Sequence, residues 1–298
     1  MIKNRQYIAT WLSLVLAISA LLYSMTNSKE TELMPKNHFV SVMDRVQKTR
    51  EIKCGYVTYA PYLQKNLQTG KLEGPIYDLI EDLGKTLNVK INWAEESDWD
   101  TMLQSIESKR FDALCSLAWM DTRRSMSAQF SVPVLYNFLF GYVRYDDKRF
   151  DNIQHINSPA ITISVLDGSP DQRIAEDRFP NAKIISAPSA GHVSKILLDV
   201  VTKKADIAFS EPSVVKDFLK HNPETLKQVG SKPVQIFPLV MILPKGDVDF
   251  KSFIDAGFTD LINRGMIEDI FSRYPEIVLN ILPVAPPYQL SRLSISEP

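Results

Sequence analysis

Cysteine, histidine and glycine are scarce in this chain of 298 residues, which contains 2 Cys, 4 His and 11 Gly. So few Cys and His exclude a zinc ribbon and a disulfide-rich scaffold, and so few Gly exclude a collagen-like chain. An excess of positive charge is also missing, because 34 basic residues face 35 acidic ones and the net charge is -1. A nucleic-acid-binding protein needs a basic surface to neutralise phosphates, so we expect no nucleic-acid partner.

Catalytic and cofactor motifs are missing as well. The sequence contains no P-loop, no G-x-S-x-G, no Rossmann glycine fingerprint and no H-E-x-x-H. The four His are scattered along the chain, so we expect neither a metal site nor a cofactor. The remaining composition, 45% hydrophobic and 23% charged, is that of a globular protein with one large or two small domains.

The first 25 residues resemble an export segment. Lys3 and Arg5 precede residues 7–25, which carry no charged side chain. A basic start followed by an apolar run is typical of a signal peptide, and this run approaches the ~20 residues that span a bilayer. A cleavable signal peptide and an uncleaved N-terminal membrane anchor both stay open, and the length of the run favours the anchor. Either one places the rest in the periplasm, secreted or tethered to the inner membrane, with residues 26–50 as a tether.

From residue 51 onwards, the hydrophobic pattern alternates between strands and helices. The predicted strands lie at residues 52–57, 89–93, 113–117, 161–165, 183–185 and 207–209, and residues 137–143 and 234–243 are two further apolar runs. Between them, apolar residues spaced i, i+3, i+4, i+7 predict amphipathic helices, for example over residues 76–87. A strand–helix–strand order implies parallel strands with crossover helices, so we predict an α/β protein with two lobes.

The two cysteines, Cys54 and Cys115, lie in strands that we expect to be neighbours in one sheet. Export would permit a disulfide between them. We nevertheless expect two small buried thiols, because a free Cys commonly packs as a small hydrophobic residue.

A series of short motifs then gives the sequence a family likeness. They are residues 52–55 (IKCG), 58–62 (TYAPY), 70–79 (GKLEGPIYDL), 111–113 (FDA), 124–131 (RSMSAQFS) and 263–266 (NRGM). In this order, over residues 52–274, they resemble the bacterial extracellular solute-binding proteins of family 3, the periplasmic polar amino-acid-binding proteins.

The resemblance implies an architecture. It is the two-lobed periplasmic-binding-protein fold (type II), in which two hinge strands join the lobes and a ligand binds in the cleft between them. Lobe 1 would comprise residues 51–138 and 236–275, and lobe 2 residues 139–235. Residues 276–298 would form a C-terminal tail.

The resemblance also implies the two charged ligand contacts. Arg124 matches the arginine that binds the ligand carboxylate, and a guanidinium suits such a bidentate contact. Arg123 is the neighbouring alternative. Glu211 falls where the family places the acid that pairs with the ligand ammonium. Its other interpretation is a helix cap before Pro212.

Further positions match the walls of the family's cleft. Tyr59 and Leu166 match the pair that sandwiches the ligand side chain, and Trp99 matches an apolar wall. Ser116 and Ser169 supply hydroxyl groups, although a strand-end Ser116 could equally bond to backbone. These ligand-binding candidates are completed by Trp119.

Two positions depart from the family. Trp119 stands where the family usually has a Ser or Thr donor, and Pro170 replaces a Thr whose hydroxyl and N–H help to hold the carboxylate. Proline has no N–H to donate. We therefore expect either that Ser169 and backbone donors suffice or that the ligand is unusual. No acid stands at Tyr56 or Val57, which makes lysine or arginine less expected as ligands.

The resemblance thus implies a non-enzymatic binding protein for a small amino acid or related carboxylate, which would serve an inner-membrane ABC permease. Two alternatives stay open. One is an enzyme similar to cyclohexadienyl dehydratases, which act on prephenate or arogenate, with Glu211 as a general acid. The other is a membrane-tethered accessory or sensor module with an altered ligand.

Overall fold

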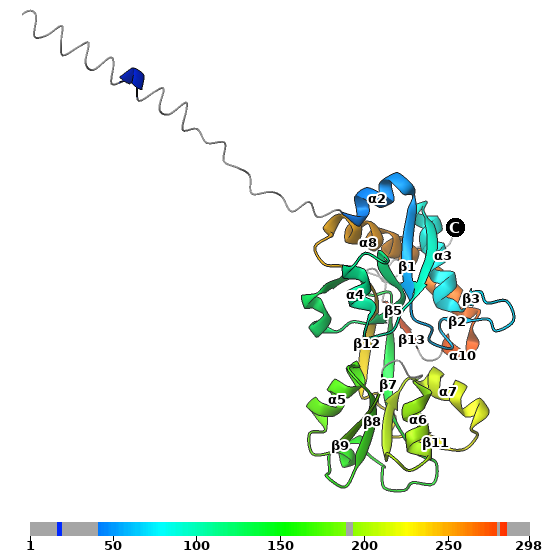
Figure 1. The fold of residues 1–298 in the computed structure, drawn as a ribbon. Coiled ribbons are helices and arrows are strands. Elements are labelled where there is room, and N and C mark those ends of the chain that lie inside the picture. The colour runs from blue at the N-terminus through cyan, green and yellow to red at the C-terminus, as the bar shows by residue number, and fades with distance from the viewer. Residues whose placement is uncertain (1–16, 20–40, 189–192, 279–280, 285–298) are drawn as a thin grey trace, which may run out of the picture. The chain divides into compact units, whose positions relative to one another are not determined.

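The computed structural model describes residues 17–19, 41–188, 193–278 and 281–284 (Figure 1). Residues 17–19 are helical, and among all described residues no helix has the length and apolar character needed to cross a bilayer. The predicted signal peptide or anchor lies outside the described residues, apart from 17–19. Residues from Val42 onwards form one compact unit.

The first lobe is built on a parallel sheet. Strand β1 (Glu51–Tyr56) lies between β4 (Lys90–Glu96) and β5 (Ala113–Trp119) and runs parallel to both. Helix α3 (Pro75–Leu87) buries Ile76, Leu79, Ile80 and Leu83, which is the predicted apolar stripe. The short helix α4 (Met102–Glu107) precedes β5. The predicted strand–helix–strand order is confirmed here.

The second lobe repeats this arrangement. Strand β8 (Thr162–Leu166) lies between β9 (Lys183–Ala187) and β10 (Ile207–Ser210), and all three are parallel. Three helices follow these strands in turn: α5 (Pro170–Arg178), α6 (Ser194–Val201) and α7 (Pro212–His221). Because α5 and α7 begin directly after β8 and β10, their first turns lie at the carboxyl ends of the parallel strands.

Two long strands pass between the lobes. In β7 (Leu135–Arg144) and β12 (Gln235–Pro244), residues 135–139 pair antiparallel with residues 235–239. Beyond that stretch β7 pairs with β10, and β12 pairs with β5. Figure 1 shows both strands at the waist of the compact unit. The predicted two-lobed α/β fold is confirmed, and the residue boundaries of the lobes stay a proposal.

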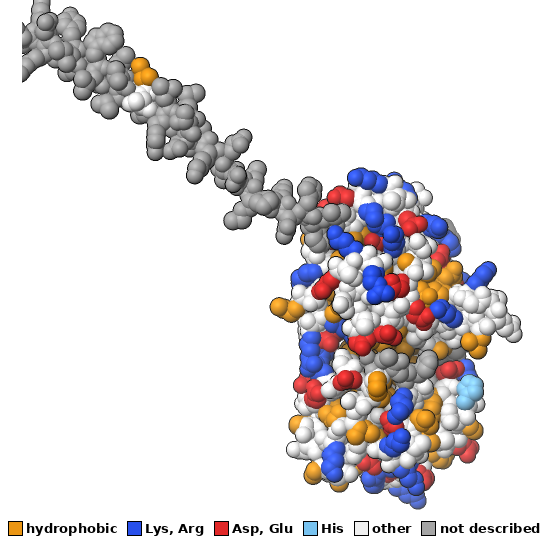
Figure 2. Space-filling model, in the orientation of Figure 1, with side chains coloured by type: hydrophobic (Ala, Val, Ile, Leu, Met, Phe, Trp, Pro, Cys, Tyr) orange, Lys and Arg blue, Asp and Glu red, His pale blue; other side chains and the backbone are white. Residues whose placement is uncertain are grey.

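The remaining elements complete the lobes. Helices α8 (Val248–Asn263) and α9 (Met266–Ser272) pack against α3. Within the predicted tail, β13 (Ile281–Pro283) pairs with β7. The other short elements are β2 (Gln64–Lys65), β3 (Leu72–Glu73), η1 (Thr122–Met126), β6 (Ala128–Phe130), η2 (Ile153–Ile156), β11 (Leu226–Gln228) and α10 (Pro275–Val278). On the face shown in Figure 2, acidic and basic side chains are interspersed.

Helix α2 (Val42–Thr49) belongs to the folded body, although we assigned residues 26–50 to a tether. Val46 is 1% exposed and packs in the core. The Val42 N–H donates to the Asp247 carboxylate over 2.6 Å, and Arg45 forms an ion pair with Asp112. We therefore propose that the folded unit begins at Val42.

The expectation of two free thiols is wrong, because Cys54 and Cys115 form a disulfide with a Cα–Cα distance of 5.4 Å. In the parallel pairing of β1 and β5, Cys54 lies opposite Ala113. This register brings the two side chains to the same place in the sheet, within the Cα separation that a disulfide requires.

Candidate ligand-binding site

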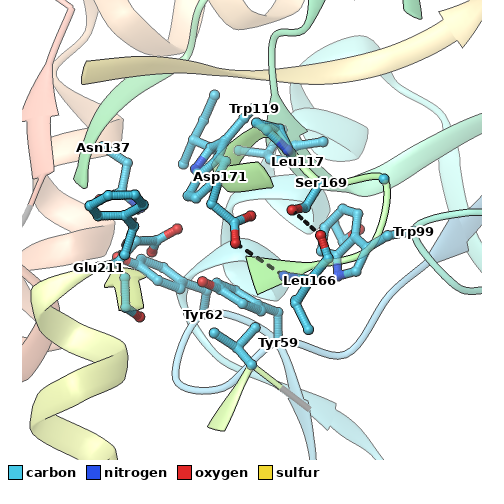
Figure 3. Close-up of a pocket in the computed structure, with 18 of the residues that line it drawn as sticks. Tyr59, Tyr62, Trp99, Leu117, Trp119, Asn137, Leu166, Ser169, Asp171 and Glu211 are labelled. Carbon is cyan, nitrogen blue, oxygen red and sulfur yellow. Dashed lines mark hydrogen bonds between the residues drawn. The ribbon is translucent and has the colours of Figure 1, made fainter. Parts of the chain in front are cut away.

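A cavity of about 300 Å³ opens between the two lobes. Its lining comes from the ends of β5, β8 and β10 and from the turns that follow these strands. The structure brings all the predicted site residues to this one cavity: Tyr59, Trp99, Ser116, Trp119, Arg124, Leu166, Ser169 and Glu211 (Figure 3). Their roles in binding a ligand stay a prediction.

Aromatic side chains line the cavity on more than one side. The rings of Tyr59 and Tyr62 stack with their centroids 5.8 Å apart, and Trp99 meets Tyr59 edge-on at 6.2 Å. Trp119 stacks on Phe237 at 4.6 Å. Trp119 is therefore anchored by packing at the position where the family has a hydroxyl group. These rings suit an apolar or planar part of a ligand.

Glu211 is a buried acid with an unused oxygen. It occupies the N-cap position of α7, but its side chain makes no capping hydrogen bond, so the structure does not support the capping interpretation. The residue is 2% exposed, and within the described part of the chain its Oε2 has no hydrogen-bond partner. Burial raises the pKa of Glu211 to about 7, against the opposing effect of the nearby polar groups of Asn137, Tyr59, Tyr62 and Trp119.

Arg124 provides the opposite charge. It lies on η1, is half-buried and lines the cavity, whereas Arg123 is exposed and does not. Within the described chain, no hydrogen bond or ion pair is formed by the Arg124 guanidinium. Burial lowers its pKa, while the carboxylate of Asp121 opposes that shift. Of the two candidate arginines, Arg124 is therefore the one available to a ligand anion.

The two predicted serines already bond within the protein. Ser116 Oγ accepts the Val57 N–H over 3.2 Å, which is the backbone bond that the alternative interpretation expected. Ser169 is the N-cap of α5: its Oγ accepts the Gln172 N–H over 3.3 Å and donates to the Leu166 carbonyl. Pro170 follows at the first position of α5, where no N–H is needed.

Two contacts hold the lobes together beside the cavity. Arg173 of α5 pairs with Asp121, which precedes η1, over 2.6 Å. The hydroxyl groups of Tyr62 and Ser213 lie 2.7 Å apart, and Asn137 Nδ2 donates to the Tyr62 hydroxyl oxygen over 3.2 Å. Both contacts join residues of the first lobe to helices of the second.

Comparison with known proteins identifies the family. The model of the bacterial extracellular solute-binding proteins, family 3, matches residues 52–276. The chain belongs to this family. The match runs from β1 into α10 and so includes every residue named at the cavity.

Two curated relatives of this family 3 protein are similar over parts of their length. A probable amino-acid ABC transporter-binding protein of Haemophilus influenzae is 30% identical over 108 residues, 36% of this chain and 40% of the relative. The ABC transporter arginine-binding protein 1 of Escherichia coli is 23% identical over 168 residues, 56% of this chain and 65% of the relative. The chain thus matches less than two thirds of the length of each.

A solved structure shares the fold of this family 3 protein. It is an ancestral amino-acid-binding protein described as a precursor of cyclohexadienyl dehydratase. The TM-score is 0.67 at 21% identity, and the match covers 78% of this chain and 99% of the other.

The cavity of this family 3 protein also contains polar residues that the sequence analysis did not select. They are Tyr62, Asp100, Asn137, Asp167, Asp171 and Ser210. Asp171 is 4% exposed, and its Oδ2 accepts the Leu166 N–H over 3.2 Å. Burial raises the pKa of Asp171 to about 6. One signal pointed to Asp171 and Ser210: ligands of open α/β sheets bind at the carboxyl ends of strands, and both residues lie there.

Proposed function

We propose that this family 3 protein captures a small amino acid or a related carboxylate in the cavity between its lobes and presents it to an inner-membrane ABC permease. The observation that carries the proposal is a pair of complementary groups in one cavity, the guanidinium of Arg124 and Oε2 of Glu211, neither of which has a hydrogen-bond partner within the described residues. An α-amino acid supplies a carboxylate for the first and an ammonium group for the second.

The other lining residues fit such a ligand. Tyr59 and Leu166, which lie on different lobes, enclose its side chain, and Trp99 and Trp119 extend the apolar walls. Ser116 and Ser169 lie beside the cavity with hydroxyl groups held by the backbone, so we assign them to shaping the site and to polar contact with the ligand. Binding in a preformed cavity of this kind limits the entropy lost on association.

The route and the compartment follow from the family. The relatives in Haemophilus influenzae and Escherichia coli are named as binding proteins of ABC transporters, which supports the same role here. The family is extracellular, and the Cys54–Cys115 disulfide is typical of an oxidising compartment. Both support a location in the periplasm.

A dehydratase similar to the cyclohexadienyl enzymes is the second candidate. A carboxyl group whose pKa is raised to about 7 holds a proton near neutral pH and can donate it to a leaving group, and Glu211 is such a group within the cavity. Glu211 would then protonate the departing hydroxyl of prephenate while carbon dioxide leaves.

One experiment tests both candidates. The full chain, purified in a mild detergent, is unfolded by heat in the presence of amino acids, keto acids, small peptides and prephenate. A ligand at 100 times its Kd adds ~2.7 kcal/mol, which raises Tm by several degrees. A shift with an amino acid supports the binding protein, and consumption of prephenate supports the enzyme. If neither occurs, both proposals are wrong.

A further inference from the structure

At the cavity, two consecutive residues each bury a side-chain oxygen that has no hydrogen-bond partner among the described residues. Ser210 and Glu211 are each 2% exposed, and both line the cavity. Among all buried side-chain oxygen and nitrogen atoms of the described chain, Ser210 Oγ and Glu211 Oε2 are the two that lack a hydrogen-bond partner. Because buried polar atoms are nearly always hydrogen-bonded in folded proteins, this pair indicates a ligand group that donates to both.

A second buried acid faces the same part of the cavity. Glu211 and Asp171 line the same cavity as Tyr59, although they stand at the starts of different helices, α7 and α5. Both carboxylates raise the pKa of the Tyr59 hydroxyl, after the larger effect of burial. Figure 3 shows both carboxylates above the paired rings of Tyr59 and Tyr62.

The charges of the lining do not balance. Arg124 is the one cationic side chain among the described lining residues, whereas the same lining contains two buried acids, Asp171 and Glu211. When Arg124, Asp171 and Glu211 are all ionised, they carry one net negative charge. A bound zwitterion has no net charge and therefore leaves that negative charge uncompensated. An uncompensated charge is unfavourable in a site of low dielectric constant. The start of α5 offsets Asp171 by only about half a charge. The exposed acids Asp100 and Asp167 on the lining add negative charge.

We propose that Asp171, together with Ser210 and Glu211, makes this site selective for a basic amino acid, which carries one carboxylate and two cationic groups. The proposal rests on the proposed binding function. Arg124 takes the carboxylate, Glu211 and Ser210 accept from the α-ammonium group, and Asp171 pairs with the cation of the side chain. The absence of an acid at Tyr56 or Val57 made such a ligand less expected, but the structure supplies one at Asp171.

The test compares ligands of similar size and different charge. The full chain is freed of co-purified ligand by unfolding and refolding in detergent. Calorimetric titrations then use lysine, ornithine and arginine against the neutral methionine and glutamine. We expect a basic amino acid to bind at least about tenfold more tightly than any neutral one. Asp171→Asn should reduce that ratio about tenfold, and Ser210→Ala should weaken binding of the basic ligand several-fold.

A matched control separates the cavity from general charge effects. Asp177 lies on the same helix as Asp171 but is exposed and outside the cavity, so Asp177→Asn should leave the ratio unchanged. If the unmodified protein prefers a neutral amino acid, the proposed selectivity is wrong, while the proposed function stands. Full selectivity in Asp171→Asn would also overturn the proposal. If the unmodified protein binds no amino acid, both the proposed selectivity and the proposed function are wrong. The comparison of ligands on the unmodified protein does not depend on the folding of any variant.

Discussion

Arg173 on α5 and Asp121 at the start of η1 form an ion pair, with 2.6 Å between Nη1 and Oδ1, that connects the two lobes beside the cavity. Asp121 is 5% exposed and also accepts the Arg123 N–H over 3.0 Å. Both contacts use Oδ1 of Asp121, and neither involves the neighbouring Arg124. The pair thus connects the lobes directly beside the candidate anion site.

Replacing Arg173 by Ala should weaken ligand binding about tenfold, because the closed arrangement loses a contact and Asp121 is left buried without its partner. Calorimetry measures the affinity, and small-angle scattering should give a larger radius of gyration for the ligand-free variant. A double-mutant cycle combines Arg173→Ala with Asp121→Asn. In the Arg173→Ala background, Asp121→Asn should reduce the affinity only slightly, because the ion pair is already lost. Strictly additive effects would show that the pair does not hold the lobes.

The two adjacent arginines allow a matched test of the anion site. Arg124→Ala removes the guanidinium at the cavity and should weaken binding of an amino acid at least about 100-fold, because two charge-assisted hydrogen bonds are lost at ~1.5–3 kcal/mol each. Arg123→Ala removes the same charge one residue away on the exposed side and should change the affinity less than about threefold. Equal effects of the two changes, measured by calorimetry, would exclude Arg124 as the carboxylate contact.

Local patterns predicted most of the fold. The stripe over residues 76–87 lies in α3, and the predicted strand at residues 113–117 is the first part of β5. Both signals depend only on neighbouring residues in the chain, which is why sequence alone contains them. Strand β13 was missed because Ile281–Pro283 has no periodicity and is a strand only through its pairing with β7.

The residues of the candidate site also fall into those that the sequence indicated and those that it did not. Arg124 and Glu211 could be selected because family motifs mark them, and the structure brings both to the cavity. Asp171 was not selected, because its burial depends on how α5 packs on β8 and β9, and no local pattern encodes that packing. The Cys54–Cys115 bond depends in turn on the register of β1 and β5, and the strand predictions did not specify that register.

The raised pKa of Glu211 predicts a stability that falls with pH. The carboxyl group is protonated in the folded state up to about pH 7, whereas in the unfolded chain it ionises near its ordinary pKa of 4.5. Between these values the folded state binds the extra proton, so the free energy of unfolding falls as the pH rises, by roughly 3 kcal/mol in all, and levels off above pH 7.

Glu211→Gln isolates this contribution. The variant cannot ionise at this position, so relative to the unmodified protein it should gain stability between pH 4.5 and 7 and keep that gain at pH 8. Urea unfolding of the ligand-free protein at several pH values measures the difference. Glu107→Gln, which changes an exposed acid on α4, is the control and should show no such trend. A difference that is constant with pH would contradict the buried, protonated state of Glu211.

The disulfide should contribute strongly to the stability of the first lobe. Cys54 and Cys115 enclose a loop with a sequence separation of 61 that contains α3, β4 and α4, and cross-linking a loop of this length restricts the unfolded chain by ~2–4 kcal/mol. The double variant Cys54→Ala/Cys115→Ala should therefore unfold at a lower urea concentration than the oxidised protein. Both sulfur atoms lie in the core, so part of the loss would come from packing.

Reduction of the unmodified protein with dithiothreitol separates the effect of the cross-link from that of packing, because it opens the loop and keeps the sulfur atoms in place. An equal midpoint for the oxidised and reduced protein would show that the cross-link adds nothing, whereas a lower midpoint on reduction, with a further decrease in the double variant, would assign one share to the loop and the other to packing.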